Sequence, residues 1–156
     1  MNDVTLNSLA TIGAALAHPG RLRILALLRE GGLYVCQIRS VLGLAASTVS
    51  VHLAVLRRAG LVNEERSGRW VHYRLAREEP VGSVVREVLH LVKDDRQVTA
   101  DSQLLAPLRR VPVDRLCRAG LYLEKFGIPG PGCRRPDPQP PRHDGAGPAP
   151  SETEST

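Results

Sequence analysis

GLAASTVSVHLAVLRRAG, residues 43–60, is the stretch that determines the fold. It predicts a tight turn over Gly43-Leu44-Ala45, a helix over residues 46–59 and a helix end at Gly60, where glycine readily takes the left-handed conformation. At 100° per residue, three apolar side chains of this helix fall within about 60° of one another and predict a buried face: Val49, Leu53 and Leu56. The segment is therefore typical of an amphipathic helix that follows a short turn.

The opposite side of this predicted helix is small, polar or basic. Together with its flanks it holds six residues: Ser47, Thr48, Ser50, Val51, Ala54 and Arg58. Short polar side chains near a helix N-terminus allow a close approach to a DNA groove, where they bond phosphates or base edges, and the helix N-terminus itself favours the phosphate charge. An ordinary amphipathic surface helix has the same apolar face, so this pattern alone leaves both interpretations open.

The elements predicted on either side complete a winged helix–turn–helix. Residues 35–42 predict a short helix before the turn. After the longer helix the period changes to alternation, which predicts strands over 61–65 and 70–75, joined by a turn over 66–69 in which Gly68 can take a positive φ. Two helices joined by a tight turn and followed by a hairpin form this layout. The expected fold class is mainly α-helical with one small β-hairpin.

Further helices are predicted by apolar stripes at helical spacing over residues 4–17, 19–29 and 81–92. A polar stretch over 93–101 precedes a segment, 102–126, that we expect to be helical in two pieces broken at Pro112. The last thirty residues contain eight prolines and five glycines, and such a composition predicts a disordered tail.

These elements divide the chain into three expected regions. Residues 1–95 form the winged helix–turn–helix domain, residues 96–126 form a helical extension that can hold a ligand, and residues 127–156 form the tail.

The positive charge of the chain is concentrated around the predicted helix–turn–helix. The formal net charge is +5, and residues 39–77 alone hold seven arginines and two glutamates. Arginine suits planar contacts to phosphate and guanine. Two of these cations, Arg66 and Arg69, lie at the hairpin tip, which suits a wing against the DNA backbone or the minor groove.

Several classes of protein are excluded by what the sequence lacks. No apolar run reaches the roughly 18 residues that a membrane span needs, and Met1-Asn2-Asp3 begins no basic segment followed by an apolar stretch, so we expect a cytoplasmic protein. The three cysteines, an odd number, argue against a disulfide framework. A phosphatase-like loop needs Arg six positions after a Cys, but those positions hold Leu42, Leu123 and Gln139. With no phosphate-binding Gly loop, His-Glu-x-x-His motif or serine elbow either, we expect no enzyme activity.

Four stretches resemble the ArsR/SmtB family of winged-helix repressors: AHPGRLRIL at 17–25, STVSVHL at 47–53, LRRAGLV at 56–62 and GRWVHYRL at 68–75. The resemblance covers about residues 6–92. It implies a homodimer with the first and last helices of this core at its interface. It further implies binding to a pseudo-palindromic double-stranded DNA operator, and release when a metal or metalloid binds.

The resemblance also assigns residues to DNA contact. It implies that four residues of the second helix read DNA: Ser47, Thr48, Ser50 and His52. Three cations complete the expected interface: Arg58, Arg66 and Arg69. Many relatives carry Gln or Pro where this chain has Ala46, and Arg where it has Val51. A valine at an outward position loses a base or phosphate contact, so we expect a different operator or weaker binding.

Two inducer sites known in the family are incomplete here. One is a Cys-Val-Cys-x-x-Cys motif on the helix before the turn, and the corresponding YVCQIR at 34–39 keeps only Cys36. The other lies on the helix at 81–92 and uses an Asp-x-His pair, for which this chain offers only Glu87, His90 and Asp94.

The predicted metal ligands are therefore Cys117 and Cys133 with Cys36. Soft trivalent metalloids prefer thiolates, so the expected inducer is arsenite or antimonite, that is As(III) or Sb(III), and no constitutive cofactor is expected. Other interpretations remain for each residue. Cys36 could be a small buried hydrophobe, Cys117 an inert helix residue and Cys133 an exposed reactive thiol.

Other functions also remain open. Cys117 and Cys133 could form a disulfide or a persulfide, which would make a redox- or sulfur-species-responsive repressor of the same fold. A repressor with no ligand, or with one that uses no thiols, is a second alternative. A winged helix that serves as a protein-interaction adaptor is a third; it predicts no salt-dependent DNA affinity, whereas a specific DNA complex weakens steeply as salt rises.

Overall fold

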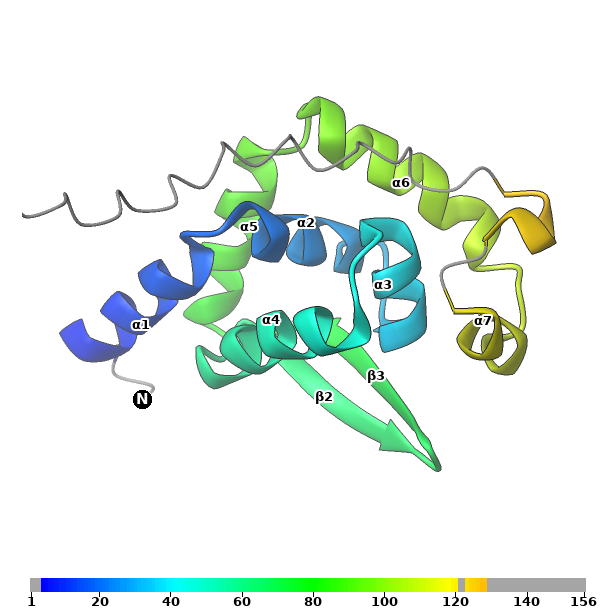
Figure 1. Cartoon of the computed structure of the whole chain (residues 1–156). Helices are drawn as coiled ribbons and strands as arrows, with labels where there is room; N and C mark the ends of the chain where they lie inside the picture. Colours follow the sequence, from blue (N-terminus) through cyan, green and yellow to red (C-terminus); the bar gives the residue numbers. More distant parts are fainter. Residues whose placement is uncertain (1–3, 121–122, 129–156) are drawn as a thin grey trace, which may run out of the picture.

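The computed structural model describes residues 4–120 and 123–128 of the 156-residue chain. Its elements follow in the order α1 (Leu6–Leu16), α2 (Pro19–Leu28), β1 (Leu33–Tyr34), α3 (Val35–Leu42), α4 (Ala46–Arg58), β2 (Val62–Ser67), β3 (Trp70–Leu75), α5 (Val81–Leu91), α6 (Arg96–Leu108), α7 (Val113–Ala119) and the 3-10 helix η1 (Leu123–Phe126). Figure 1 shows α2 and α3 at the centre, with α6 on one side of them and α4 with the hairpin on the other. The predicted mainly helical fold with a small sheet is confirmed.

The helix–turn–helix has the predicted turn and the predicted buried face. α3 and α4 meet at 113°, within the range typical of this motif. Gly43 ends α3 in the left-handed conformation with φ 68°, and its N–H donates to the carbonyl oxygen of Arg39 over 2.9 Å. The apolar face of α4 is completely buried against α3 and its neighbours: Val49, Leu53 and Leu56.

The wing is a three-stranded antiparallel sheet in the order β1-β3-β2. β2 and β3 pair from Val62 opposite Leu75 to Ser67 opposite Trp70, and Gly68 takes a φ of 59° in the turn between them. These features confirm the predicted hairpin. The short strand β1 was not predicted, because two residues show no periodicity and β1 is defined only by its pairing with β3.

The first helix of the C-terminal extension begins earlier than residue 102, where the sequence predicted it. The polar stretch expected over 93–101 is helical from Arg96 onward, because the Asp95 carboxylate caps the helix and accepts the N–H groups of Gln97 and Val98 over 2.8 and 3.1 Å. The predicted break at Pro112 is confirmed, since α7 begins directly after it. Most of the predicted tail, from residue 129 onward, lies outside the described residues.

A buried ion pair holds α6 on α2. The guanidinium of Arg23 donates two hydrogen bonds to the two carboxylate oxygens of Asp101, over 2.7 and 2.8 Å. The amide of Gln97 donates a third bond to the same carboxylate over 2.9 Å. Because the Asp101 side chain is only 3% exposed, these three donors replace the water that the carboxylate loses on burial.

One apolar face stays uncovered in the single chain. The sequence predicted an apolar stripe on the first helix, and of its members only Ile12 is buried, next to Ala15 of the same helix. Leu6 and Leu9 are 87% and 51% exposed, and Leu91 at the end of α5 is 80% exposed. Large exposed leucines on the first and last helices of a small domain are typical of a protein–protein contact surface.

Among the described residues, no single helix is both long and apolar enough to cross a membrane, and the bent α3–α4 pair passes that test only by length and composition.

Replacing Asp101 with Ala should destabilise the fold by about 3 kcal/mol, because the partly buried Arg23 guanidinium then lacks its counter-charge and two hydrogen bonds. The free energy of unfolding in urea, measured on reduced protein, checks this value. Asp94→Ala is the matched control, since Asp94 is exposed and its removal should change stability by less than about 0.5 kcal/mol. Equal stabilities for the two variants would contradict the role assigned to the ion pair.

Candidate nucleic-acid interface and cysteine pair

The first turn of α4 is open to solvent. Ser47, Thr48 and Ser50 are all exposed. The residue before the helix, Ala45, offers no side-chain acceptor to the free N–H groups of this turn, and the turn contains no acidic residue. The helix N-terminus therefore keeps its partial positive charge, which attracts an anion such as a DNA phosphate.

The outward face of α4 is small and apolar in its middle. Val51 is 62% exposed, and Ala54, one turn further on, is also exposed. Arg58 extends the same side at the C-terminal end of the helix, where it is exposed. A duplex lying along this face would meet hydroxyls first, then small apolar groups, then a cation.

His52 does not lie on this outward face. The resemblance placed it among the residues that read DNA, but the structure buries it to 9% exposure, because position 52 lies three residues after Val49 and four before Leu56 and so shares their face of the helix. Its ring lies 4.5 Å from the ring of His18, centroid to centroid. Its Nδ1 atom is buried and has no hydrogen-bond partner among the described residues.

His18 in turn fixes the start of α2. Its Nδ1 accepts the N–H of Gly20 over 3.0 Å and so caps the helix. Burial lowers the pKa of His52 below its ordinary value, and the neighbouring His18 and Arg21 lower it further. The two neighbouring histidine rings therefore connect α4 to the N-terminus of α2. The surroundings of His52 favour its neutral form.

Glu64 connects the end of α4 with the wing. It accepts the hydroxyl of Tyr73 over 2.9 Å and lies 3.5 Å from Arg57 and 3.4 Å from Arg66. The Tyr73 hydrogen bond, more than the arginines, lowers the pKa of Glu64. Burial and this carboxylate raise the pKa of Tyr73 to about 12. α4 and the wing are thus tied together through one ionised carboxylate.

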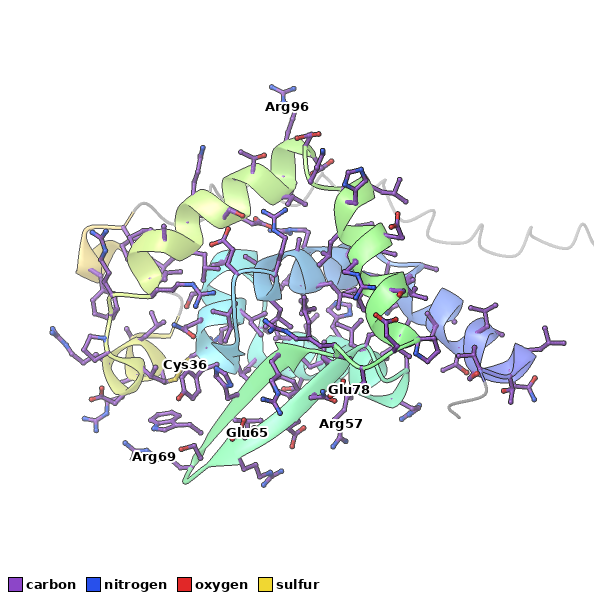
Figure 2. The ribbon with its side chains drawn as sticks, turned by 180° about the vertical axis from the view of Figure 1, so that it is seen from behind. Cys36, Arg57, Glu65, Arg69, Glu78 and Arg96 are labelled. Carbon is purple, nitrogen blue, oxygen red and sulfur yellow. A yellow bond between two sulfur atoms is a disulfide. The ribbon has the colours of Figure 1, made fainter. Side chains whose placement is uncertain are left out.

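The tip of the wing presents cations to solvent. The Arg66 side chain is 77% exposed, and the guanidinium of Arg69 lies 4.6 Å from the ring centroid of Trp70. Figure 2 shows Arg69 near the hairpin tip and Arg57, which belongs to α4, near the other end of the hairpin. The structure therefore brings the predicted wing arginines and the exposed residues of α4 onto adjacent elements.

Two of the three cysteines form a disulfide. Cys36 in α3 and Cys117 in α7 are bonded through their sulfur atoms, with Cα atoms 5.2 Å apart. The bond joins residues separated by 81 positions. The odd cysteine count argued against a disulfide framework, and the sequence left a Cys117–Cys133 disulfide open only as an alternative to a thiolate metal site, so the pairing of Cys117 with Cys36 is a finding of the structure. Cys133 lies outside the described residues.

A metal centre is not assembled in the part of the chain that the structure describes. No group of three or more His, Cys, Asp or Glu side chains there could hold a metal ion. The three remnants of the second family site are all exposed at the end of α5 and just beyond it: Glu87, His90 and Asp94.

Comparison with known proteins relates this geometry to one family. The family model described as "bacterial regulatory protein, arsR family" matches residues 18–64. The chain is 43% identical over 91 residues to the HTH-type transcriptional regulator CmtR of Mycobacterium tuberculosis, covering 56% of this chain and 77% of CmtR. It is 46% identical over 66 residues to the arsenic resistance transcriptional regulator ArsR1 of Pseudomonas putida, covering 42% of this chain and 52% of ArsR1.

A solved structure matches the fold. It is the homodimeric winged helix–turn–helix DNA-binding domain of a possible ArsR-family transcriptional regulator from Mycobacterium bovis, determined by solution NMR. The TM-score is 0.51 and the identity 32%, covering 60% of this chain and 92% of that domain.

The lowered pKa of His52 predicts that acid weakens the fold. The unfolded chain binds a proton at His52 at a higher pH than the folded chain does, so stability is complete above the ordinary pKa of about 6.5 and decreases as pH falls below it. His52→Gln should lose less stability than the native chain between pH 7.5 and pH 5.5, as measured by urea unfolding. The exposed His90 provides the control, because His90→Gln should keep the native slope. A native slope in His52→Gln would refute the assignment.

Proposed function

Because this chain belongs to the ArsR family of bacterial regulatory proteins, we propose that it is a transcriptional repressor that binds a pseudo-palindromic operator as a homodimer and responds to the state of Cys36 and Cys117. The observation that carries the proposal is the position of Cys36. It lies in the first turn of α3, the helix that leads directly into α4. The Cys36–Cys117 disulfide therefore constrains α3, and through α3 it can affect α4, the helix expected to contact DNA.

The exposed residues of α4 and the wing support DNA binding. α4 lies in the major groove, with the hydroxyls of Ser47, Thr48 and Ser50 toward phosphates and base edges. Arg58 contacts the backbone, and the wing cations contact the backbone or the minor groove. His52 has no direct part in this contact and instead supports the packing of α4 on the start of α2.

The uncovered leucines of α1 and α5 support a homodimer. Leu6, Leu9 and Leu91 would lose their exposure to water if these helices met a second copy. The similar domain from Mycobacterium bovis is homodimeric. Two copies of α4 placed about 34 Å apart would enter successive major grooves of one duplex face.

The cysteine pair supports a thiol switch, and we name a hydroperoxide as its oxidant. Cys117 is partly exposed whereas Cys36 is only 6% exposed, so Cys117 reacts first. With hydrogen peroxide, its sulfur forms an S–O bond as the O–O bond breaks, and water leaves with the thiol proton. The Cys36 sulfur then displaces the oxygen, an S–S bond forms, and a second water leaves with the proton of Cys36. The two sulfurs lose two electrons, which reduce one peroxide to two waters.

The switch acts on DNA through α3. A bond to α7 fixes one end of α3, and the other end continues through the Gly43 turn into α4. We expect the dithiol form to hold the operator and the disulfide form to release it, because the spacing of the two α4 helices changes. Coupling between two sites of this kind is typically about 1–3 kcal/mol, a factor of roughly 5–150 in affinity.

A thiophilic metalloid is the second candidate signal. The two sulfurs meet in one place, which is the first requirement for As(III) or Sb(III), and a third thiolate from Cys133 would complete a pyramid. ArsR1 of Pseudomonas putida is an arsenic resistance regulator by name. The disulfide is our first choice because Cys36 and Cys117 form it without a third ligand.

Operator binding by the reduced and oxidised protein tests the switch. A duplex is first selected from random sequences with the reduced dimer, and affinity is then followed by fluorescence anisotropy. Hydrogen peroxide should weaken binding by the native chain about fivefold or more, and Cys36→Ser and Cys117→Ser should each keep their affinity under peroxide. Cys133→Ser is the matched control and should respond like the native chain.

The same assay separates the alternatives. Release by arsenite or antimonite under strict reduction, abolished by Cys133→Ser, would replace the disulfide by a metalloid site. Peroxide release that persists in Cys36→Ser would exclude the cysteine pair as the switch. Failure to select any dyad-symmetric duplex would refute the repressor itself.

Val51→Arg should strengthen operator binding. An arginine at this exposed outward position adds a phosphate contact, which should make the slope of log affinity against log salt steeper by about 0.9. Ala100→Arg adds the same charge at an exposed position of α6 and should leave the slope unchanged. Equal slopes in the two variants would show that α4 does not lie on DNA in the proposed orientation.

A further inference from the structure

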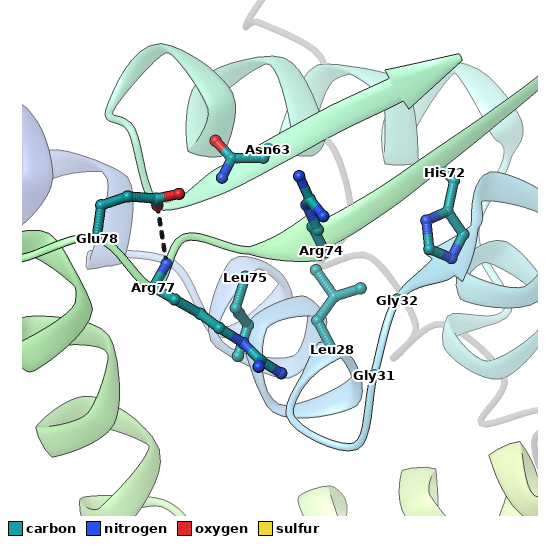
Figure 3. Close-up of a pocket in the computed structure, with 9 residues that line it drawn as sticks. All are labelled: Leu28, Gly31, Gly32, Asn63, His72, Arg74, Leu75, Arg77 and Glu78. Carbon is teal, nitrogen blue, oxygen red and sulfur yellow. Dashed lines mark hydrogen bonds between the residues drawn. The ribbon is translucent and has the colours of Figure 1, made fainter. Parts of the chain in front are cut away.

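A cavity of about 330 Å³ lies between the turn after α2 and the strands of the wing. Figure 3 shows it: Leu28 and Leu75 form its apolar part, and Gly31 and Gly32 pass along one edge. Neither glycine is interchangeable with a larger residue. Gly31 has a φ of 131°, and a Cβ on Gly32 would overlap the ring of His72. The turn is therefore built close to the strand, and the absence of side chains on it leaves the cavity open.

Two arginines line the cavity, one just before Leu75 and one just after it in the sequence. Arg74 lies on β3 and Arg77 on the segment after it, and both are exposed. In Figure 3 their side chains lie on either side of Leu28 and Leu75. No acidic side chain of the described residues makes a salt bridge to either guanidinium.

The one acidic residue of the lining is already engaged. The Glu78 carboxylate accepts the backbone N–H of Arg77 over 3.0 Å, the bond drawn in Figure 3. Its pKa is lowered by hydrogen bonds from its own N–H and that of Arg77, and to a smaller extent by the Asn63 side chain. The carboxylate is therefore ionised and bound to the backbone, and two guanidinium groups share one negative charge.

A third arginine approaches the same edge from the C-terminal extension. The guanidinium nitrogens of Arg109, which follows α6, lie 3.8 Å from the position that a Cβ on Gly31 would occupy. Three arginines thus lie around the turn that contains Gly31 and Gly32: Arg74, Arg77 and Arg109.

The cavity is separate from the surface proposed for DNA. Side chains alternate across a strand, so His72 and Arg74 lie on the face of β3 opposite to the buried Tyr73. The outward face of α4 and the wing tip are built from other residues. A molecule in the cavity would therefore contact the base of the wing and not α4.

We propose that this cavity binds a small oxyanion, a carboxylate or a phosphate monoester with a short apolar part. Guanidinium groups bind both anions in pairs of parallel hydrogen bonds, and the volume is at the lower end of those that hold small ligands. Asn63 and His72 supply further polar contacts at the wall, and Leu28 and Leu75 contact the apolar part. Binding at this site does not depend on whether the chain binds DNA.

Titration of the full chain with two probes tests the proposal: inorganic phosphate and succinate, each at pH 7 and at an ionic strength held constant with sodium chloride. The NMR amide signals of Gly31 and Gly32 report on the cavity directly. We expect saturable shifts of these signals with at least one probe. Arg74→Gln and Arg77→Gln should each weaken binding about tenfold, the effect of losing a charged hydrogen bond.

Arg96→Gln is the matched control, because Arg96 is exposed at the start of α6, far from the hairpin (Figure 2). It removes the same charge and should keep the native affinity. Shifts that grow without saturation, or equal affinity in Arg74→Gln, Arg77→Gln and the native chain, would overturn the proposal. Shifts of both glycine signals with a random DNA duplex and with neither probe would overturn it too, since the arginines would then bind the DNA backbone.

Discussion

The hydrogen bonds between the Arg23 guanidinium and the Asp101 carboxylate hold α6 against α2. Burying a carboxylate is costly, and here the cost is offset because Arg23 and Gln97 supply three donors to it. α6 is thereby held along α2. Its far end brings Arg109 to Gly31, and α7 beyond it brings Cys117 to Cys36. The meeting of the two cysteines and the approach of Arg109 to the cavity both follow from the position of α6 on α2, which buried apolar residues of α6 also support.

α3 occupies the position through which a chemical change can reach DNA. One end of it is bonded to α7 through Cys36, and the other end continues through Gly43 into α4. Glu64 then links the end of α4 to the wing, through Tyr73 and the flanking arginines. The surface proposed for DNA is therefore held together as a unit, and it is more easily displaced as a whole than deformed in parts.

The errors made from sequence have separate physical causes. His52 belongs to a stretch that resembles DNA-reading residues, but its spacing of three and four residues from Val49 and Leu56 puts it on the buried side of α4. The start of α6 was misplaced because polar composition was taken as a loop, whereas Asp95 makes the same residues a capped helix. β1 was missed because it is defined only by its pairing with Tyr73 and His72, which lie about forty residues further along the chain.

The helix–turn–helix and the hairpin are local consequences of the amino-acid sequence, because Gly43, Gly60 and Gly68 end or turn the chain by backbone preferences that act over a few residues. Apolar spacing within α4 likewise set its buried face. The tertiary structure alone decided that Cys36 meets Cys117 and that arginines from β3 and α6 gather at Gly31. Such neighbours are separated by tens of residues, and only the packing of α6 on α2 brings them together.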